Sequence, residues 1–198
     1  MNKNKFLITQ TLLSSWNWSY KLEDGYEDFL KTLNKEAMQP NQAMLDGQQF
    51  ENMVYAHCEG ATLDEEHKWA EGIRKVSEIV KNGAYQVKLS KPLIIDNVEF
   101  LLYGIFDVLK EGQIYDIKFS KTYSFGKYLD SPQHSMYFEL CPEVNKFTYL
   151  ISDGKELYKE RYERYDTKPI ELEIKQFMKF LDERNLVDIY CQKWKSKY

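Results

Sequence analysis

Two aspartates and a lysine stand at the ends of two consecutive apolar segments. The segment Phe100–Phe106 leads into Asp107, and after a turn at Gly112 a second apolar segment contains Asp116 and Lys118. Apolar runs rich in β-branched and aromatic residues, separated by a Gly-containing turn, predict a β-hairpin. Residues two apart on a strand point to the same face of a sheet, so the side chains of Asp116 and Lys118 should lie together.

Two carboxylates and an ammonium group at one strand edge have the chemistry for metal-dependent hydrolysis of a phosphodiester. Carboxylate oxygens hold hard cations such as Mg²⁺ or Mn²⁺, and the cation generates a hydroxide and stabilises the charge of the displacement. Lys118 would orient the water or hold the scissile phosphate. The alternative is a structural ion pair of Asp116 with Lys118, which leaves Asp107 without a role. Of the five places where an acid precedes a lysine by two residues, only this one lies in a β-branched and aromatic run.

Two further segments carry polar residues at helical spacing. Gly47 opens a helical stretch that runs to about Cys58 and places Glu51 on its first turns, where the carboxylate could face the hairpin edge. The alternative is a glutamate that only stabilises a helix N-terminus through the macrodipole. Gln133 and Tyr137 are four residues apart and therefore share one face of a helix. The alternative for them is an ordinary polar–aromatic helix pair.

In chain order the motifs are Gly47-x-x-x-Glu51, Gly104-Ile-Phe-Asp107, Asp116-Ile-Lys118 and Gln133-x-x-x-Tyr137. The set resembles the PD-(D/E)XK nuclease superfamily, in particular its RecB-like and lambda-exonuclease-like branch, over roughly residues 8 to 140. The resemblance implies a restriction-endonuclease-like core in which a metal ion is bound by Glu51, Asp107, Asp116 and the carbonyl of Ile117. It assigns Lys118 to catalysis, and Gln133 and Tyr137 to substrate binding beside the site.

The chain departs from that family pattern in three respects. The third acid is Asp116 rather than the commoner Glu, which shortens its reach by one methylene. The alkaline exonucleases of phages place an Arg near the N-terminus to hold a 5′-phosphate, whereas the first Arg here is Arg74, with Lys21 or Lys31 as substitutes. Some RecB-like relatives bind an iron–sulfur cluster through four Cys, and this chain has three Cys.

Two functions from different classes follow. The first is a metal-dependent DNA nuclease, and the resemblance implies an exonuclease. It also implies a role in phage or prophage DNA recombination, with a single-strand annealing protein as partner. The relatives form rings, so a homo-oligomer is expected. The second is a catalytically silent nuclease-fold module that binds DNA or a protein partner. The four charged residues of the motifs favour the first. A formal net charge of −4 and the absent N-terminal Arg favour the second.

A basic cluster follows the second strand and consists of Lys118, Lys121 and Lys127. Its functional interpretation is contact with the phosphate backbone, which carries no sequence information. The alternative is an ordinary solvated loop. His134, next to Gln133, is expected to be exposed.

The sequence predicts a single domain, residues 1–198. It also predicts a cytoplasmic protein. The length suits a single domain. The cysteines Cys58, Cys141 and Cys191 are odd in number and far apart, which indicates reduced thiols and a cytoplasmic protein. No apolar run reaches the length of a membrane span, and no signal-peptide pattern opens the chain.

The pattern of apolar residues predicts an α/β fold with a mixed central β-sheet flanked by helices. Helices are expected over residues 14–33, with Ser14 or Ser15 as N-cap, and over 42–58, 64–81, 130–141, 169–182 and 184–195. Strands are expected over 84–95, 98–108 and 112–119 as a meander, and over 145–152 and 156–165 as a second hairpin.

Overall fold

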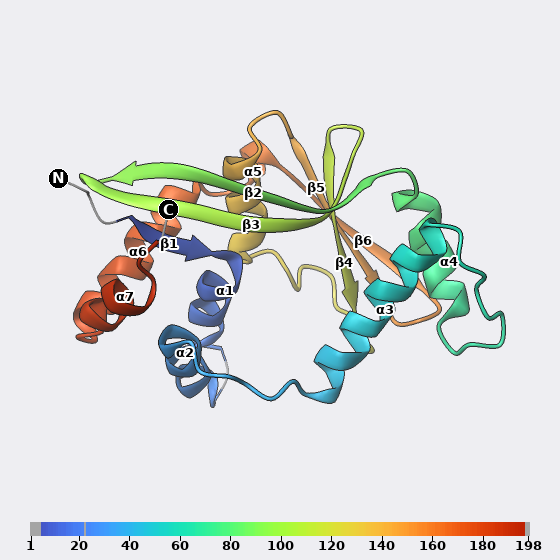
Figure 1. Ribbon diagram of the computed structural model, residues 1–198, viewed down its shortest axis with the longest axis horizontal. Coiled ribbons are helices and arrows are strands. Elements are labelled where there is room, and N and C mark those ends of the chain that lie inside the picture. Colours follow the sequence, from blue (N-terminus) through green and yellow to red (C-terminus); the bar gives the residue numbers. More distant parts are fainter. Residues whose placement is uncertain (1–4, 22, 197–198) are drawn as a thin grey trace.

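The computed structural model describes residues 5–21 and 23–196, and within them the fold is α/β, with a mixed six-stranded sheet flanked by helices (Figure 1). The predicted fold class is confirmed. Residues 1–4, 22 and 197–198, which the single-domain prediction includes, lie outside this description. The strands are β1 (Phe6–Thr9), β2 (Ala84–Ile95), β3 (Val98–Lys110), β4 (Gln113–Phe119), β5 (Lys146–Ser152) and β6 (Leu157–Glu163). The α-helices are α1 (Gln10–Trp18), α2 (Gly25–Asn34), α3 (Gln42–Cys58), α4 (Ala70–Val80), α5 (Pro132–Leu140), α6 (Ile170–Glu183) and α7 (Val187–Lys193).

Strand β3 lies inside the sheet and pairs with several other strands. Along one edge it pairs antiparallel with β2 from Val98 to Leu109. Because that edge is occupied, β1 and β4 must share the other edge. Strand β1 pairs with its first part, Phe100–Tyr103, in parallel, and β4 pairs with its last part, Val108–Lys110, antiparallel. The sheet then continues through β5, parallel to β4, and ends at β6, antiparallel to β5.

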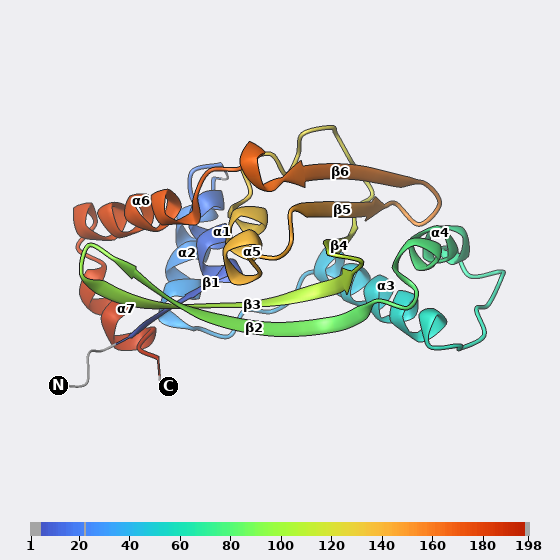
Figure 2. The same cartoon turned by 90° about the horizontal axis from the view of Figure 1, so that it is seen from above.

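Helices cover the sheet as two groups with separate cores. One core gathers α1, α2, α5, α6 and α7 around large side chains such as Leu12, Phe29 and Phe177. The other joins α3 and α4 to the sheet through Phe50 and Ile117 among others. Figure 1 shows α3 and α4 at one end of the molecule and α6 and α7 at the other. In the view from above, β5 and β6 run side by side along one side of the molecule, and the long β2–β3 hairpin runs along the other side (Figure 2).

The N-terminal region differs most from the predicted elements. Strand β1 was not predicted, because four residues are too few to show an alternating pattern. The helix predicted over 14–33 is two helices, and its first N-cap is Thr9, whose Oγ1 accepts from Leu12 N at 3.2 Å, rather than Ser14 or Ser15. The break ends at Gly25, where a Cβ would meet the Trp18 carbonyl oxygen at 2.4 Å, so only glycine allows α2 to pack there.

Three other elements are shorter than predicted. The helix expected from residue 64 begins at Ala70, the helix expected from 184 begins at Val187, and the strand expected to reach 165 ends at Glu163, before a short 3-10 helix. The strands of the central meander and the helices over 42–58 and 169–182 are confirmed to within about two residues, which is the usual disagreement between definitions of element ends.

Candidate active site

A gap in the pairing of β3 creates the candidate site. Strand β1 pairs with β3 up to Tyr103, and β4 pairs with it only from Val108, so the residues from Gly104 to Asp107 face no strand on this edge. Backbone polar groups that no strand satisfies need other partners. The main-chain carbonyl groups in this gap therefore need hydrogen-bond donors from the helices that pack on the sheet.

Two tyrosines from different helices fill this gap. The Tyr137 hydroxyl on α5 donates to the Ile105 carbonyl oxygen at 2.7 Å, and the Tyr55 hydroxyl on α3 lies 3.3 Å from the Asp107 carbonyl oxygen. Each tyrosine is preceded by a polar residue one helical turn earlier, Gln133 on α5 and Glu51 on α3. Since residues four apart share a helix face, docking each tyrosine on β3 also turns its polar partner toward the gap.

Asp107 and Asp116 are the next residues beyond the last Cα pair between β3 and β4, Val108 with Tyr115. Here the side chain of Asp107 replaces the missing strand contact, because its Oδ2 accepts from Ile117 N at 2.8 Å. Ile117 is buried in the core beneath α3 and α4. Alternation along β4 therefore turns Asp116 and Lys118 to the opposite face.

Asp116 is the most buried charged group of the site, with 1% of its surface exposed. Its Oδ1 accepts from Gln133 Nε2 at 2.5 Å. Its Oδ2 lies 2.6 Å from Lys118 Nζ, so the ammonium group is the ion-pair partner of this buried oxygen. A buried carboxylate needs a positive partner, which Lys118 supplies here and which a bound cation would share or replace.

The carboxylates repel one another. Burial, and then the charge of Asp116, raise the pKa of Asp107 well above its usual value. Burial also raises the pKa of Glu51, although the hydrogen bond from Tyr55 opposes it. Burial alone would lower the pKa of Lys118, but the charges of Asp116 and Asp107 outweigh it and raise that pKa. Excess negative charge thus collects here, with Lys118 as its counter-ion.

Oxygen ligands of this kind suit Mg²⁺ or Mn²⁺. In the described part of the chain no group of three or more His, Cys, Asp or Glu side chains is already arranged to hold a metal ion. Glu51 already has two donors: its Oε1 accepts from the Tyr55 hydroxyl at 2.6 Å and from Gln86 Nε2 at 2.8 Å. Asp107, Asp116 and Glu51 line the same pocket, and a cation held there would have to compete with Lys118 for Asp116 and with these donors for Glu51.

Most of the predicted site residues line one pocket of about 440 Å³. The seven predicted residues that the structure brings together there are Glu51, Asp107, Asp116, Ile117, Lys118, Gln133 and Tyr137. Lys127 lines an adjoining hollow of about 150 Å³ that shares Lys118 and Gln133 with the pocket. Lys121 lines neither, and its Nζ lies 3.2 Å from Asp46 Oδ2.

The structure also places the two lysines that stand in for an N-terminal Arg. Lys21 lines the adjoining hollow beside Lys127, with its Nζ 3.6 Å from Asp130 Oδ2. Lys31 forms an ion pair with Asp28 on the surface of α2, at 3.1 Å, and does not line that hollow.

Two expectations about individual residues were wrong. Glu51 is the tenth residue of α3, not in its first turns, so stabilisation of a helix N-terminus does not explain it. His134 is buried, with 4% exposed, because α5 packs it flat against Tyr162 at a ring-centroid distance of 4.4 Å.

Residues that the sequence did not reveal orient Glu51. Tyr55 follows it by four residues, a spacing that could have indicated the pair. Gln86 gave no signal: it lies in β2 with a φ of +52°, in the region that favours glycine, and it is missing from the register between its neighbours Tyr85 and Val87. Strained backbone of this kind is concentrated at functional sites. Here it brings the Gln86 amide to Glu51 and, at 3.0 Å, to the Tyr55 hydroxyl.

No family model and no curated protein matches this chain. Among solved structures, the crystal structure of SSO0001 is similar, with a TM-score of 0.53 and 11% sequence identity, over 92% of this chain and 79% of that one. At this identity the likeness concerns the fold alone: an α/β arrangement with a mixed sheet. Within the described residues, no helix has the length and apolar character needed to cross a membrane.

Proposed function

We propose that this protein is a metal-dependent DNA nuclease that hydrolyses phosphodiester bonds. The observation that carries the proposal is the gap in β3, where Asp107, Asp116 and Glu51 line one pocket with Lys118, which pairs with the buried Asp116 carboxylate. The order and spacing of the four sequence motifs support the same activity. We favour exonuclease action on the resemblance of those motifs to phage alkaline exonucleases.

Each residue of the pocket has a distinct task in this proposal. Asp107 and Asp116, with Glu51 and the Ile117 carbonyl, would hold Mg²⁺ or Mn²⁺, which when bound supplies a hydroxide at neutral pH and offsets the charge of the phosphate. Lys118 stays protonated because two carboxylates raise its pKa, so it can donate to a phosphate oxygen or to the attacking water. Gln133 fixes Asp116 through its amide, and Tyr137 fixes α5 on β3.

The adjoining hollow extends the proposal to the substrate. Lys21 and Lys127 there would contact phosphates next to the scissile one, and Lys121 would contact the backbone farther out. Such contacts position DNA without reading its sequence. They also counter the negative net charge of the whole chain locally.

Its biological setting is part of the proposal. We place the enzyme in the cytoplasm, where Cys58, Cys141 and Cys191, all free in the structure, would remain reduced. The resemblance points to phage or prophage recombination, with an annealing protein as partner and assembly into a homo-oligomer.

The deciding test is cleavage of linear duplex DNA with Mg²⁺ or Mn²⁺, with EDTA as control. Asp107→Asn and Asp116→Asn should each abolish cleavage while the protein stays folded, since a neutral amide cannot offset a dication. Asp182→Asn, an exposed position at the end of α6, is the matched control and should keep full activity.

Two results would refute the assignment in different ways. Full activity of either pocket variant would show that the carboxylates are not metal ligands. A wild-type protein that binds DNA but does not cut it under any of these conditions would favour the catalytically silent DNA-binding module.

A further inference from the structure

The loop between β4 and α5 presents an aromatic side chain to solvent. Phe125 in this loop is 91% exposed, a large apolar side chain left in water. The loop leaves β4 directly after Lys118 and Phe119, and its residues Lys127 and Tyr128 line the adjoining hollow together with Gln133 of α5. Phe125 therefore lies on the segment that leads from the candidate catalytic lysine to the adjoining hollow.

A buried carboxylate clamps the loop on both sides of Phe125. Glu160 on β6 is 3% exposed, and its Oε1 accepts from the Tyr123 hydroxyl at 2.8 Å and from Gly126 N at 2.9 Å. Its Oε2 accepts from Tyr128 N at 3.4 Å. Burying a carboxylate is costly unless it is fully hydrogen-bonded. Glu160 obtains those bonds from the loop and, at 2.7 Å, from the Tyr162 hydroxyl.

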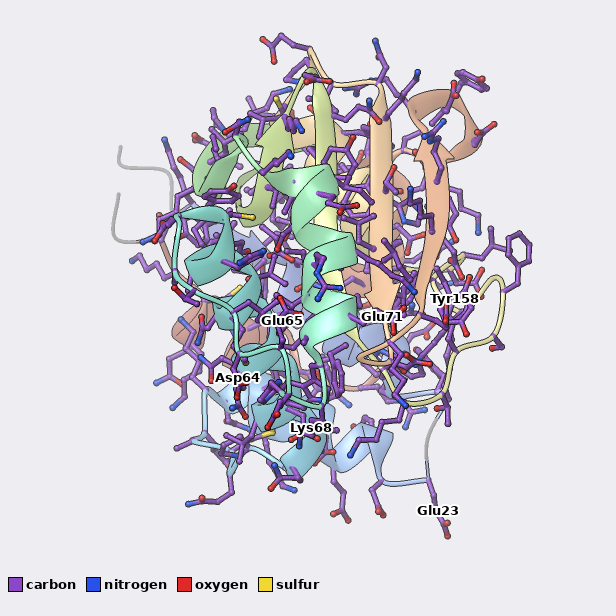
Figure 3. All side chains as sticks on the ribbon, turned by 90° about the vertical axis from the view of Figure 1, so that its right-hand side faces the viewer. Glu23, Asp64, Glu65, Lys68, Glu71 and Tyr158 are labelled. Carbon is purple, nitrogen blue, oxygen red and sulfur yellow. The ribbon has the colours of Figure 1, made fainter. Side chains whose placement is uncertain are left out.

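Ring contacts hold the loop at the same two points. Tyr123 stacks on Tyr158 of β6 with ring centroids 4.8 Å apart, and Figure 3 shows Tyr158 on the outer edge of the sheet. Tyr128 stacks on Tyr149 of β5 at 4.4 Å. Between them Gly126 has a φ of +81°, a conformation that favours glycine and turns the chain back toward the pocket. The loop is thus anchored on each side while its aromatic tip is left free.

The charges around Phe125 favour a nucleic acid as its partner. Lys127, two residues away, is exposed and donates to Ser120 Oγ at 3.1 Å, and the side chain of Lys121 is 73% exposed although its Nζ pairs with Asp46. Lys118 and Lys21 line the hollow that Lys127 and Tyr128 also line. Lysines that track a backbone, combined with an exposed ring for the bases, are what single-stranded nucleic acid binding requires.

We propose that Phe125 stacks on a nucleobase of the DNA next to the scissile phosphate, with the Glu160 clamp holding the ring in place for it. This inference rests on the proposed function for the identity of its ligand. A stacked base next to the cleaved bond would fix how far the strand enters the pocket. Because every base has a π-face, the contact would act on any sequence.

The test uses Phe125→Ala, Phe125→Trp and Phe125→Leu in the full-length protein. The probes are single-stranded and linear duplex DNA that carry 2-aminopurine at successive positions from one end, with Ca²⁺ in place of Mg²⁺ and a gel to verify intact DNA. Phe125→Ala should weaken DNA binding about 5- to 150-fold and abolish the quenching of 2-aminopurine at one position. Phe125→Trp should retain both, and Phe125→Leu should lose the quenching.

Ile94→Ala is the matched control, since Ile94 is a 70% exposed apolar residue near the turn between β2 and β3. It should bind DNA like wild type. Equal affinity and quenching in wild type and Phe125→Ala would overturn the stacking proposal, as would a wild-type protein that binds neither DNA. Loss of affinity without a change in fluorescence at any position would also overturn it. Binding and quenching without cleavage in Mg²⁺ or Mn²⁺ would instead refute the proposed nuclease activity and leave the stacking contact standing.

Discussion

The environment of Lys118 combines a buried ion pair with partial exposure to the pocket. Its ammonium group lies 2.6 Å from a carboxylate oxygen of Asp116 that is almost fully buried, yet its own side chain remains 32% exposed. Lys118 lines the same pocket as Asp107 and Asp116, so part of its ammonium group is open to whatever enters there. In the proposed nuclease, this exposed part of the lysine would meet the phosphate.

Replacing Lys118 with Ala should lower the rate of DNA cleavage about 10²- to 10³-fold, the typical cost of losing one donor that stabilises developing charge. Metal binding, measured by calorimetry, should persist because the carboxylates remain. Single-turnover cleavage at saturating DNA separates this loss from weaker binding. Lys110→Ala is a suitable control, since Lys110 Nζ donates to the Ile79 carbonyl oxygen, away from the pocket, at 2.7 Å. Unchanged turnover in Lys118→Ala would make the lysine a plain counter-ion.

At this scale the sequence predicted which charged residues lie together better than it predicted the contacts that hold them. Asp107, Asp116 and Lys118 could be found because charged residues are rare inside β-branched runs, and the structure gathers them as expected. Gln86 could not be found, since its position depends on a strained φ that only the folded sheet imposes. The burial of His134 depends equally on tertiary packing, because it is set by Tyr162 on a strand about 30 residues later.

The key element is the edge of β3 shared by β1 and β4. Gly104 stands at the start of the gap, where a Cβ would lie 2.7 Å from Leu140 Cδ1 and 2.9 Å from Tyr137 Cε1. A glycine there lets α5 approach the strand closely enough for the Tyr137 hydroxyl to reach the Ile105 carbonyl. The position of Gln133, one turn earlier on α5, follows from that contact.

Gly104→Ala should therefore destabilise the protein by about 1–3 kcal/mol, the usual cost of overpacking. It should also reduce DNA cleavage, because displacing α5 moves Gln133 away from Asp116. Gly47→Ala is the matched control: a Cβ added to this residue of α3 would meet nothing within 4 Å, so the change should leave cleavage intact and add roughly 0.5–1 kcal/mol of stability. Urea unfolding of both variants measures the difference, and equal stability of wild type and Gly104→Ala would contradict the close approach.

Sequence periodicity predicted the long strands of this sheet but did not reveal the gap in the pairing of β3. The alternating residues of β2 and β3 and the turn at Gly112 predict their hairpins, because pattern and turn chemistry are local. Strand β1 has only four residues and pairs with a strand about 90 residues later, so nothing local indicates it. The gap between β1 and β4 was hidden for the same reason, although its contents were predicted.

On the scale of the molecule, the site lies at the junction of two cores. Glu51 belongs to the helix that packs on the core of α3 and α4, and Gln133 to a helix of the larger core. Both helices contact β3 through their tyrosines, and Gln133 also reaches Asp116 on β4. Changes in packing on either side therefore reach the site, and global stability and activity should be coupled.

His134 links that stability to pH. It lies in the larger core beside Gln133, and burial lowers the pKa of its imidazole to about 4, although the charge of Glu160 opposes the shift. In the unfolded chain a histidine titrates at roughly 6.5. Both states carry a neutral imidazole above that pH. As the pH falls from about 6.5 toward 4, the unfolded chain takes up a proton that the folded protein resists, so stability declines over this window and the loss is complete near pH 4.

The free energy of unfolding should therefore fall by about 2 kcal/mol from this one group between pH 7 and pH 5, and by about 3 kcal/mol once the pH reaches 4. His134→Phe keeps an aromatic ring against Tyr162 and removes the titrating group, so its stability should decline less over the same interval. Urea unfolding of both proteins at pH 7, 6 and 5 gives the comparison, because the carboxylates titrate alike in each and cancel in the difference. Parallel stability profiles would mean that His134 takes up its proton in the folded state as readily as in the unfolded chain, and that the core around α5 opens to water without unfolding.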